Sequence, residues 1–401
     1  MDDITEAREG RSRIKEIMGL EGGREILLRE ATEEDMDEIK RLYYVVYGGK
    51  YTLPEVNNAD KMRWAINDPN YLWLLNVADT EIVGSVLFVV DPEHNIGKAM
   101  AGVVLPEFRG SRLMARSLKR GITYLMEEEC LCDLIYAIVR TFISTSFHRE
   151  LHELGFVDLG VFPNVRKVKE YETHGLKVRF LPEIFEVRRK KPQLTKEANE
   201  IYKIVRKKLK LESAEVKNLT LKHPPNGKKL ELYIDRSADT EWEYYKKRDL
   251  KELSCSFFPL HYPQAKLYSK DRRTEAFIHL QEWDGHAALL GFKTDHEDVT
   301  AVLGTICNYA ESMGAKYLEL LISAYDRQMQ QMAYDAGFLP TAYFPAARKT
   351  PEGERLDYVV TSRTFVPPNF KGVKLTEESK PYIQTYYKLY TKKLWEDIQS
   401  A

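Results

Sequence analysis

Residues 103–118 read VVLPEFRGSRLMARSL. The stretch begins as an apolar run, stops at Pro106, passes an Arg109–Gly110 pair and continues in a helical pattern. Proline cannot donate to a sheet ladder, so the run predicts a strand that ends there. A helix that opens directly after it exposes backbone N–H groups without acceptors and carries about half a positive charge. The stretch therefore predicts an anion-binding helix N-terminus.

Two arginines strengthen this expectation. Arg109 and Arg112 would add charge-assisted hydrogen-bond donors beside the free amides. Such a combination suits a phosphate or a pyrophosphate, so we expect a nucleotide-like ligand at this position.

The sequence around this stretch predicts one α/β layer. An antiparallel meander leads into a strand–helix–strand unit. The expected elements are, in order, strand 25–32, helix 32–49, strands 71–77, 81–91 and 96–106, helix 111–129, strand 132–141 and helix 144–154.

Five residues of this stretch resemble the acetyl-CoA signature of the GNAT N-acyltransferases, V-x-P-x-(Y/F)-R-G. The matching residues are Val104, Pro106, Phe108, Arg109 and Gly110. The resemblance covers about residues 25–168, and its last third is weakly similar to the β-lysine acetyltransferase branch. It implies a mixed, mostly antiparallel sheet flanked by helices, and acetyl-CoA or another acyl-CoA as co-substrate.

The resemblance also implies which residues would hold coenzyme A. The backbone of Val103, Val104 and Leu105 would pair with the pantetheine arm as an added strand. Ser144 begins a helix and is either its N-cap or a polar contact to the same arm. The pyrophosphate would be held by the amides of the loop and of the first helical turn, at Arg109, Gly110, Ser111, Arg112, Leu113, Met114 and Ala115.

Two positions depart from the family pattern. Arg112 stands where the family has a second motif glycine, and Met114 stands where a small residue follows. These side chains would either narrow the site or point away from it, and Arg112 could replace amide contacts with a charged one. A domain of this shape that has lost its ligand is the alternative.

Amine acetylation needs an unprotonated nitrogen, a polarised thioester carbonyl and an acid for the leaving thiolate. The family often places a tyrosine as the acid four residues before the Gly155 position, where this chain has Leu151. His148 and His152 lie one turn apart on the same helix and are the nearest titratable candidates. Ordinary, partly exposed helix histidines are the other interpretation.

Acceptor contacts are expected from two segments. Asp91 and Glu93 lie between two strands on the expected acceptor side, where Glu93 would serve as a base unless both are turn formers. Tyr43 and Tyr47 share a helical face at spacing four, and either contact the acceptor or pack in the core.

The second half of the chain repeats the first. ELHELGFVDLGVFPNVRKV at 150–168 matches MAYDAGFLPTAYFPAARKT at 332–350, with a constant separation of 182 residues between Gly155 and Gly337 and between Pro163 and Pro345. We infer a tandem duplication of a domain of about 190 residues. The second copy reads AALLGFKTDHEDVTAVL at 287–303, without an Arg–Gly pair. Its acidic side chains would repel a pyrophosphate, so we expect no coenzyme there: Asp295, Glu297 and Asp298.

Composition excludes several partners. The 60 Lys and Arg balance the 61 Asp and Glu, so no global field recruits nucleic acid or anionic lipid. The basic stretch at 187–200 has no interleaved aromatic residue and is expected to be a solvated linker helix. Cys130 and Cys132 are separated by one residue, which is neither a zinc-ligand nor a thioredoxin spacing, so we expect no metal and two packed thiols in a reducing compartment. No signal peptide or membrane span is recognisable, so we expect a cytoplasmic protein. The oligomeric state is not specified by the sequence.

Together these observations predict two tandem GNAT-like α/β domains. The expected boundaries are an N-terminal helical extension at 1–24, an acyl-CoA-binding domain at 25–190, a linker helix at 191–213 and a degenerate second domain at 214–401. The expected activity is transfer of an acyl group from acyl-CoA to the primary amine of a small-molecule acceptor, by direct attack and without a covalent enzyme intermediate. A non-catalytic CoA-binding scaffold and a protein-lysine acyltransferase are the alternatives.

Overall fold

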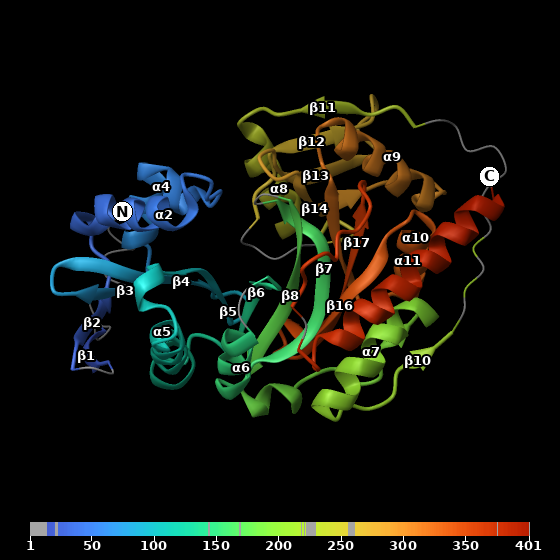
Figure 1. Ribbon diagram of the computed structural model, residues 1–401. Coiled ribbons are helices and arrows are strands. Elements are labelled where there is room, and N and C mark those ends of the chain that lie inside the picture. Colours follow the sequence, from blue (N-terminus) through green and yellow to red (C-terminus); the bar gives the residue numbers. More distant parts are fainter. Residues whose placement is uncertain are drawn as a thin grey trace. The chain divides into compact units, whose positions relative to one another are not determined.

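The computed structural model describes residues 14–20, 23–142, 145–167, 170–217, 219, 221, 230–255, 261–374 and 376–400. The chain divides into two compact units, shown in Figure 1. The first comprises residues 1–138, 144–157 and 177–182, and the second comprises 139–143, 158–176 and 183–401. This division does not follow the expected domain boundary near residue 190, because a strand of the first half pairs with one of the second at Gly160 and Ala342.

The sheet of the first unit is mostly antiparallel. Its strands are, in spatial order, β1 (Lys15–Gly19), β2 (Glu25–Glu30), β3 (Tyr71–Ala78), β4 (Glu81–Asp91), β5 (Ile96–Val104) and β6 (Leu134–Arg140). Only β5 and β6 pair in parallel within this order. The helix expected over residues 1–24 is wrong at β1, which instead forms a hairpin with β2 in which Met18 pairs with Ile26. Cross-strand pairing there outweighs the helical propensity of a polar segment.

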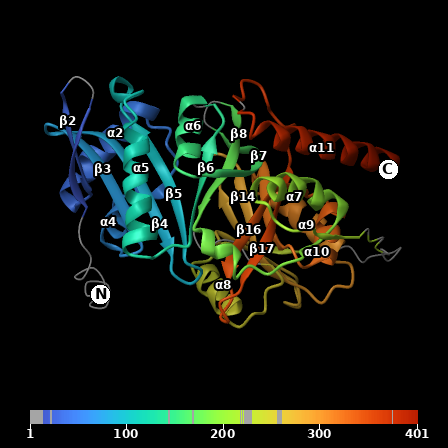
Figure 2. The ribbon, with the colours of Figure 1, turned by 90° about the horizontal axis from the view of Figure 1, so that it is seen from below.

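Helices cover both faces of this sheet. They are α2 (Met36–Tyr47), α3 (Pro54–Asn57), α4 (Ala59–Asn67), α5 (Leu113–Thr123) and α6 (Thr145–Glu153). On β4, Ser85 contacts Tyr43 of α2, whereas Phe88 lies against Gly121 of α5. Side chains three residues apart on a strand point to opposite faces, so α2 and α5 lie on opposite faces of the sheet. Figure 2 shows α5 crossing its face.

The second unit contains a longer sheet. Its strands are, in spatial order, β8 (Tyr171–Phe180), β7 (Val157–Lys167), β16 (Leu339–Lys349), β17 (Arg355–Thr364), β15 (Tyr317–Ser323), β14 (His286–Lys293), β13 (Glu275–Gln281), β12 (Ala265–Tyr268) and β11 (Tyr233–Asp235). Its main helices are α7 (Lys196–Leu209), α8 (Asp239–Asp249), α9 (Val299–Ser312), α10 (Arg327–Asp335) and α11 (Lys380–Ser400). The two-residue strands β9 (Gln193–Leu194) and β10 (Glu215–Val216) form a short parallel pair.

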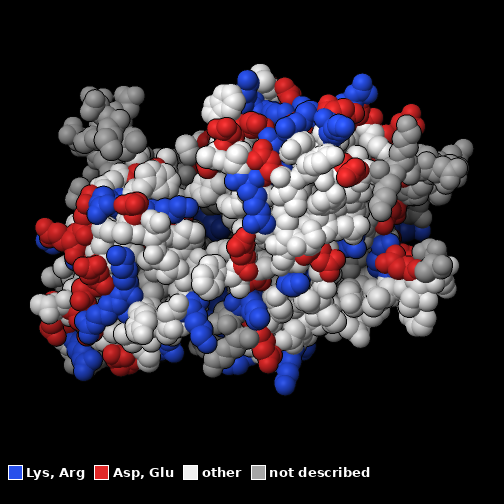
Figure 3. Space-filling model, turned by 90° about the horizontal axis from the view of Figure 1, so that it is seen from above, with Lys and Arg blue, Asp and Glu red and all other residues white. Residues whose placement is uncertain are grey.

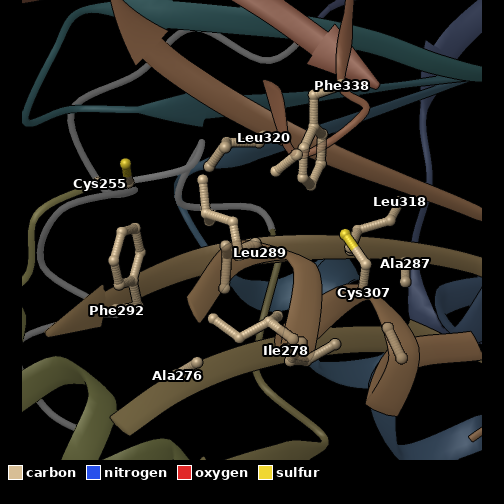
Figure 4. Close-up of a cluster of buried hydrophobic side chains, with 14 of the residues drawn as sticks. Cys255, Ala276, Ile278, Ala287, Leu289, Phe292, Cys307, Leu318, Leu320 and Phe338 are labelled. Carbon is tan, nitrogen blue, oxygen red and sulfur yellow. The ribbon is translucent and has the colours of Figure 1, made fainter. Parts of the chain in front are cut away.

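The core of this unit lies between α9 and the strands β13 to β15. Val302, Leu303 and Ile306 of α9 are fully buried in one cluster with Leu318 and Leu320 of β15. Figure 4 shows Cys307 of α9 beside Leu318 in this cluster. The segment expected as a linker helix is helical at α7, and this helix packs on β16, where the Tyr202 ring lies 4.5 Å from that of Tyr343. The mixed, mostly antiparallel sheets with flanking helices confirm the predicted fold class.

The same order of elements occurs twice along the chain. The elements β5, α5, β6, α6, β7, β8 and α7 are followed by β14, α9, β15, α10, β16, β17 and α11. Fine details repeat as well: Asn164 and Ala346, which are 182 residues apart, both adopt left-handed backbone conformations. Arg179 donates to the carbonyl of Leu154 after α6, and Arg363 donates to that of Ala336 after α10.

Charges of both signs lie on the one face of the molecule that Figure 3 shows. On the face shown in Figure 3, Lys and Arg side chains lie among Asp and Glu side chains, in keeping with a formal net charge of −1. The described residues contain no group of three His, Cys, Asp or Glu side chains arranged to hold a metal ion. Cys130 is exposed, whereas Cys132, Cys255 and Cys307 are buried. Within the described chain, no helix combines the length and apolar character that crossing a bilayer requires.

Candidate active site

The first unit contains a place where two parallel strands separate. Strand β5 pairs with β6 from Ile96 and Leu134 to Ala99 and Ala137, and no later pair joins them among the described residues. On its other edge β5 stays paired with β4 as far as Val104. One edge of β5 beyond Ala99 is therefore left for another extended chain, which is the geometry of β-strand addition.

A β-bulge marks the separation. Ser85 pairs with Val103 and Leu87 with Met100, so two residues of β5, Ala101 and Gly102, oppose a single residue of β4. Ala101 has a φ of 55°, a conformation that residues other than glycine rarely adopt. Bulges of this kind bend the strand and end its pairing, which accounts for the divergence of β5 from β6.

After β5 the chain turns tightly into α5. Leu105 donates its N–H to Val83, and Pro106–Phe108 form one turn of 3-10 helix. Gly110 then takes a φ of 83° and Arg112 a φ of 60° before α5 begins at Leu113. A residue with a β-carbon is strained at both positions, so the glycine in the Arg109–Gly110 pair is required by the backbone.

The N-terminus of α5 has no side-chain cap. Arg112 occupies the N-cap position and accepts no hydrogen bond with its side chain. The amides of Leu113, Met114 and Ala115 form the first helical turn and have no intrahelical acceptor. The helix dipole adds positive potential at this end, so the turn offers donors to an anion.

The packing of α5 on the sheet fixes the position of this turn. Ser117 donates to the Asn76 side chain on β3 at 2.9 Å. A β-carbon at Gly121 would lie 2.4 Å from the Phe88 ring, so only glycine allows this close approach. The amides at the start of α5 are thus held in place by contacts about one and two turns further along the helix.

Arg112 and Met114 depart from the family pattern, and both side chains lie away from the amides of the first helical turn. Arg112 forms an ion pair with Glu153 of α6. The Met114 thioether lies against Gly102, where an added β-carbon would be 3.4 Å from its sulfur. Ser111 donates to the Phe108 carbonyl at 2.6 Å, and Arg109 is exposed.

The predicted acids and bases are not gathered at this turn. Asp91 and Glu93 belong to the β4–β5 turn, where Glu93 donates its N–H to Asp91. That turn precedes Ile96, at the opposite end of β5 and roughly 26 Å along the strand from Val104. Asp91 is buried and Glu93 is exposed.

Helix α6 carries the two predicted histidines. His148 is buried, and the Nε2 of His152 lies 3.1 Å from the Lys177 ammonium. An ammonium only donates, so the His152 Nε2 is the acceptor in this contact. Leu151 is buried between them, and Ser144 lies outside the described residues.

One tyrosine of α2, Tyr43, contacts the bulge. Tyr43 is buried, and its hydroxyl donates to the Ala101 carbonyl. Burial raises the pKa of this hydroxyl well above its ordinary value. The half-buried Tyr47 and Tyr51 rings lie 4.6 Å apart, and Tyr51 lies 4.8 Å from Tyr43. The sequence suggested a core or substrate role for Tyr43 but gave no signal for its bond to the bulge.

The corresponding helix of the second unit begins differently. Asp298 is the N-cap of α9 and accepts a hydrogen bond from Ala301 N–H at 3.0 Å. His296 accepts from the Asp298 N–H through Nδ1 at 3.1 Å. The carboxylate thus caps a helix end whose counterpart in the first unit has no side-chain cap.

The separated strand of the second unit is also covered by the chain itself. Pairing of β14 with β15 runs from His286 to Leu289, and Ser254 donates its N–H to the Phe292 carbonyl at 2.7 Å. A β-carbon on Gly291 would lie 2.8 Å from both the Cys255 carbonyl and the Leu253 side chain. The segment Leu253–Cys255 therefore lies on β14 beside its bulge, a contact that the sequence gave no means of predicting.

Comparison with known families agrees with this geometry. Residues 34–156 match the model of the family described as the acetyltransferase (GNAT) family. This segment is a GNAT domain. The match contains the separated strands, the loop and helix α5, whereas the second unit's copy lies outside it. No curated protein sequence matches the chain.

Solved structures give further likenesses. A GNAT acetyltransferase of Streptococcus pneumoniae is 18% identical over 39% of this chain and 99% of its own, with a TM-score of 0.35. The ribosomal-protein-S5-alanine acetyltransferase of Vibrio fischeri is 14% identical over 42% of this chain and 98% of its own, with a TM-score of 0.36. The yncA protein of Salmonella typhimurium, solved with its cofactor acetyl-CoA, is 17% identical over 39% and 95%, with a TM-score of 0.34.

Proposed function

We propose that the GNAT domain binds acetyl-CoA, or another acyl-CoA, and transfers the acyl group to the primary amine of a small molecule. The observation that carries this proposal is the uncapped start of α5, placed directly after a strand that has separated from its neighbour. An anion-binding turn next to an open strand edge suits a ligand that joins a pyrophosphate to an extended amide-containing arm.

We assign the pyrophosphate to the amides that follow Pro106. Gly110 and the first turn of α5, at Leu113, Met114 and Ala115, provide N–H donors. Arg109 is exposed beside them and supplies a charge-assisted contact. The pantetheine arm would lie along the open edge of β5 between Gly102 and Leu105.

The reaction needs no covalent enzyme intermediate. The amine nitrogen attacks the thioester carbon, a C–N bond forms and the C–S bond breaks. The proton lost by the nitrogen balances the one gained by the leaving thiolate of coenzyme A. Orientation of the two substrates supplies a large part of the rate in such a transfer, and the buried Leu151 leaves the family's usual tyrosine acid without a replacement at that position.

Release of free thiol from acetyl-CoA over a panel of small amines tests the proposal. We expect amine-stimulated turnover in the wild type, and none in the Arg109→Ala, Gly110→Asp double variant. Binding of acetyl-CoA without turnover on any amine would instead support a CoA-binding scaffold, which the buried Leu151 favours. Turnover on peptide lysines but not on free amines would support a protein-lysine acyltransferase.

A further inference from the structure

A buried chain of hydrogen bonds crosses the first unit's sheet beneath α2. The Trp73 Nε1–H donates to the Ser85 hydroxyl at 2.8 Å, and that hydroxyl lies 3.4 Å from the Tyr43 hydroxyl. The Tyr43 hydroxyl in turn contacts the carbonyl of Ala101. All four residues are buried.

The donor and acceptor roles in this series of hydrogen bonds follow from the groups at its two ends. The indole N–H only donates and the carbonyl only accepts. The single proton of Tyr43 is therefore given to Ala101, and Ser85 donates to the Tyr43 oxygen. Trp73, Ser85 and Tyr43 therefore each donate to the next group in the series, which ends at the backbone of β5.

The last acceptor in this series of hydrogen bonds is Ala101, the residue that forms the bulge. Ala101 has a φ of 55°, which costs about 1 kcal/mol or more for a residue other than glycine and persists only where the surroundings enforce it. In a bulge of this type, glycine is the usual residue at the left-handed position. The hydrogen bond from the Tyr43 hydroxyl stabilises the left-handed conformation of Ala101, which a glycine would adopt without such help.

We propose that Tyr43 is a positioning residue for the coenzyme. Its hydroxyl holds the Ala101 bulge, and the bulge keeps β5 apart from β6 so that its edge can accept the pantetheine arm. This inference rests on the proposed function, since it concerns the same site, and it assigns Tyr43 to the backbone of β5 instead of to the acceptor.

The test measures the affinity of four purified full-length proteins for acetyl-CoA by isothermal titration calorimetry. Tyr43→Phe removes only the hydroxyl, and we expect the Kd to rise by about tenfold or more, which is a loss of about 1.4 kcal/mol. Ser85→Ala is the matched control. It removes a buried hydroxyl from the same chain but leaves the bond to Ala101, so we expect the Kd to stay within about twofold.

The fourth protein tests rescue. Ala101→Gly on the Tyr43→Phe background lets the bulge form without the hydroxyl, so we expect affinity to recover. A merely structural role for Tyr43 would lower the melting temperature in Tyr43→Phe and Ser85→Ala alike and would give no such rescue.

The outcomes separate the two proposals. Tight binding by the wild type with unchanged affinity in Tyr43→Phe overturns the role of Tyr43 and leaves the proposed function standing. No binding by the wild type overturns the proposed function itself. Where Tyr43→Phe does not fold, Ala101→Val takes its place, because a β-branched residue disfavours the left-handed conformation with the hydroxyl intact. Unchanged affinity in that variant also overturns the inference.

Discussion

The starts of α5 and α9 occupy the same place in two copies of one arrangement, yet their chemistry is opposite. At α5 the N-cap is Arg112, whose side chain is drawn away into an ion pair with Glu153. At α9 the N-cap is Asp298, whose carboxylate accepts from the first turn. A carboxylate there supplies the negative charge that the helix end favours, whereas an uncapped end leaves that place to a ligand.

The edges of β5 and β14, the strands that precede these helices, also differ. Beyond the bulge, β5 has no second partner strand among the described residues, whereas β14 receives a hydrogen bond from Ser254 at Phe292. In the second copy, segments of the chain itself cap the helix start and cover the strand edge. The comparison teaches that two stretches with the same order of elements can differ in whether the helix start carries a cap of its own.

The largest effect is expected from Arg109→Ala combined with Gly110→Asp. The new carboxylate would lie at the start of α5 and repel a diphosphate, and the φ of 83° would be strained by a side chain. We expect the Kd for acetyl-CoA to rise by about 100-fold or more. Nothing lies within 4 Å of a β-carbon at Gly110, so the fold should persist, as circular dichroism would check. Unchanged affinity would remove the distinction between the two helix starts.

The second-largest effect, on stability, is expected from alanine substitutions of two glycines, one beside each β-bulge. Gly291→Ala would drive a β-carbon against the Cys255 carbonyl at 2.8 Å, so we expect the free energy of unfolding to fall by about 1–3 kcal/mol. Gly102→Ala meets only the flexible Met114 side chain at 3.4 Å, so we expect a change of stability below about 1 kcal/mol. Urea unfolding measures both. Equal losses would show that the segment Leu253–Cys255 does not fill the second copy's edge.

Removing the cap of α9 should affect stability but not coenzyme binding. Asp298→Ala leaves the first-turn amide of Ala301 without its acceptor, which typically costs about 1 kcal/mol. Arg112→Ala is the matched variant at α5 and loses only an exposed ion pair, worth about 0–1 kcal/mol. Thermal unfolding and calorimetric titration with acetyl-CoA give the two readouts. A changed acetyl-CoA affinity in Asp298→Ala would contradict the assignment of binding to the first copy alone.

The smallest effect is expected from Arg112→Gly. Glycine adopts the φ of 60° without strain, which favours the native turn, while the ion pair with Glu153 is lost. These contributions oppose one another, so we expect the Kd for acetyl-CoA to stay within about threefold of the wild type. A much larger loss in the titration would show that the guanidinium contacts the ligand directly.

The sequence predicted the parts of the fold that depend on local pattern. Pro106 and Gly110 indicate the strand end and the turn, and the repeated Gly155 and Gly337 indicate the two copies. Each of these residues acts through its own backbone restrictions, so each can be recognised without knowing what lies nearby.

Contacts between distant segments could not be predicted in this way. Tyr43 meets Ala101 across 58 positions, and Ser254 reaches Phe292 from outside the repeated segment. The strand at Lys15–Gly19 was mistaken for helix for the same reason, since only its partner β2 determines its conformation. Pairing and burial decide such features, and both appear only once the chain is folded.

The stoichiometry of acetyl-CoA binding tests the central claim most directly. In an isothermal titration of the full-length chain, the account predicts one site per chain. That site should be lost in the Arg109→Ala, Gly110→Asp variant and retained in Asp298→Ala. Two sites per chain, or a single site that survives the double substitution, would contradict the assignment of coenzyme binding to the start of α5 alone.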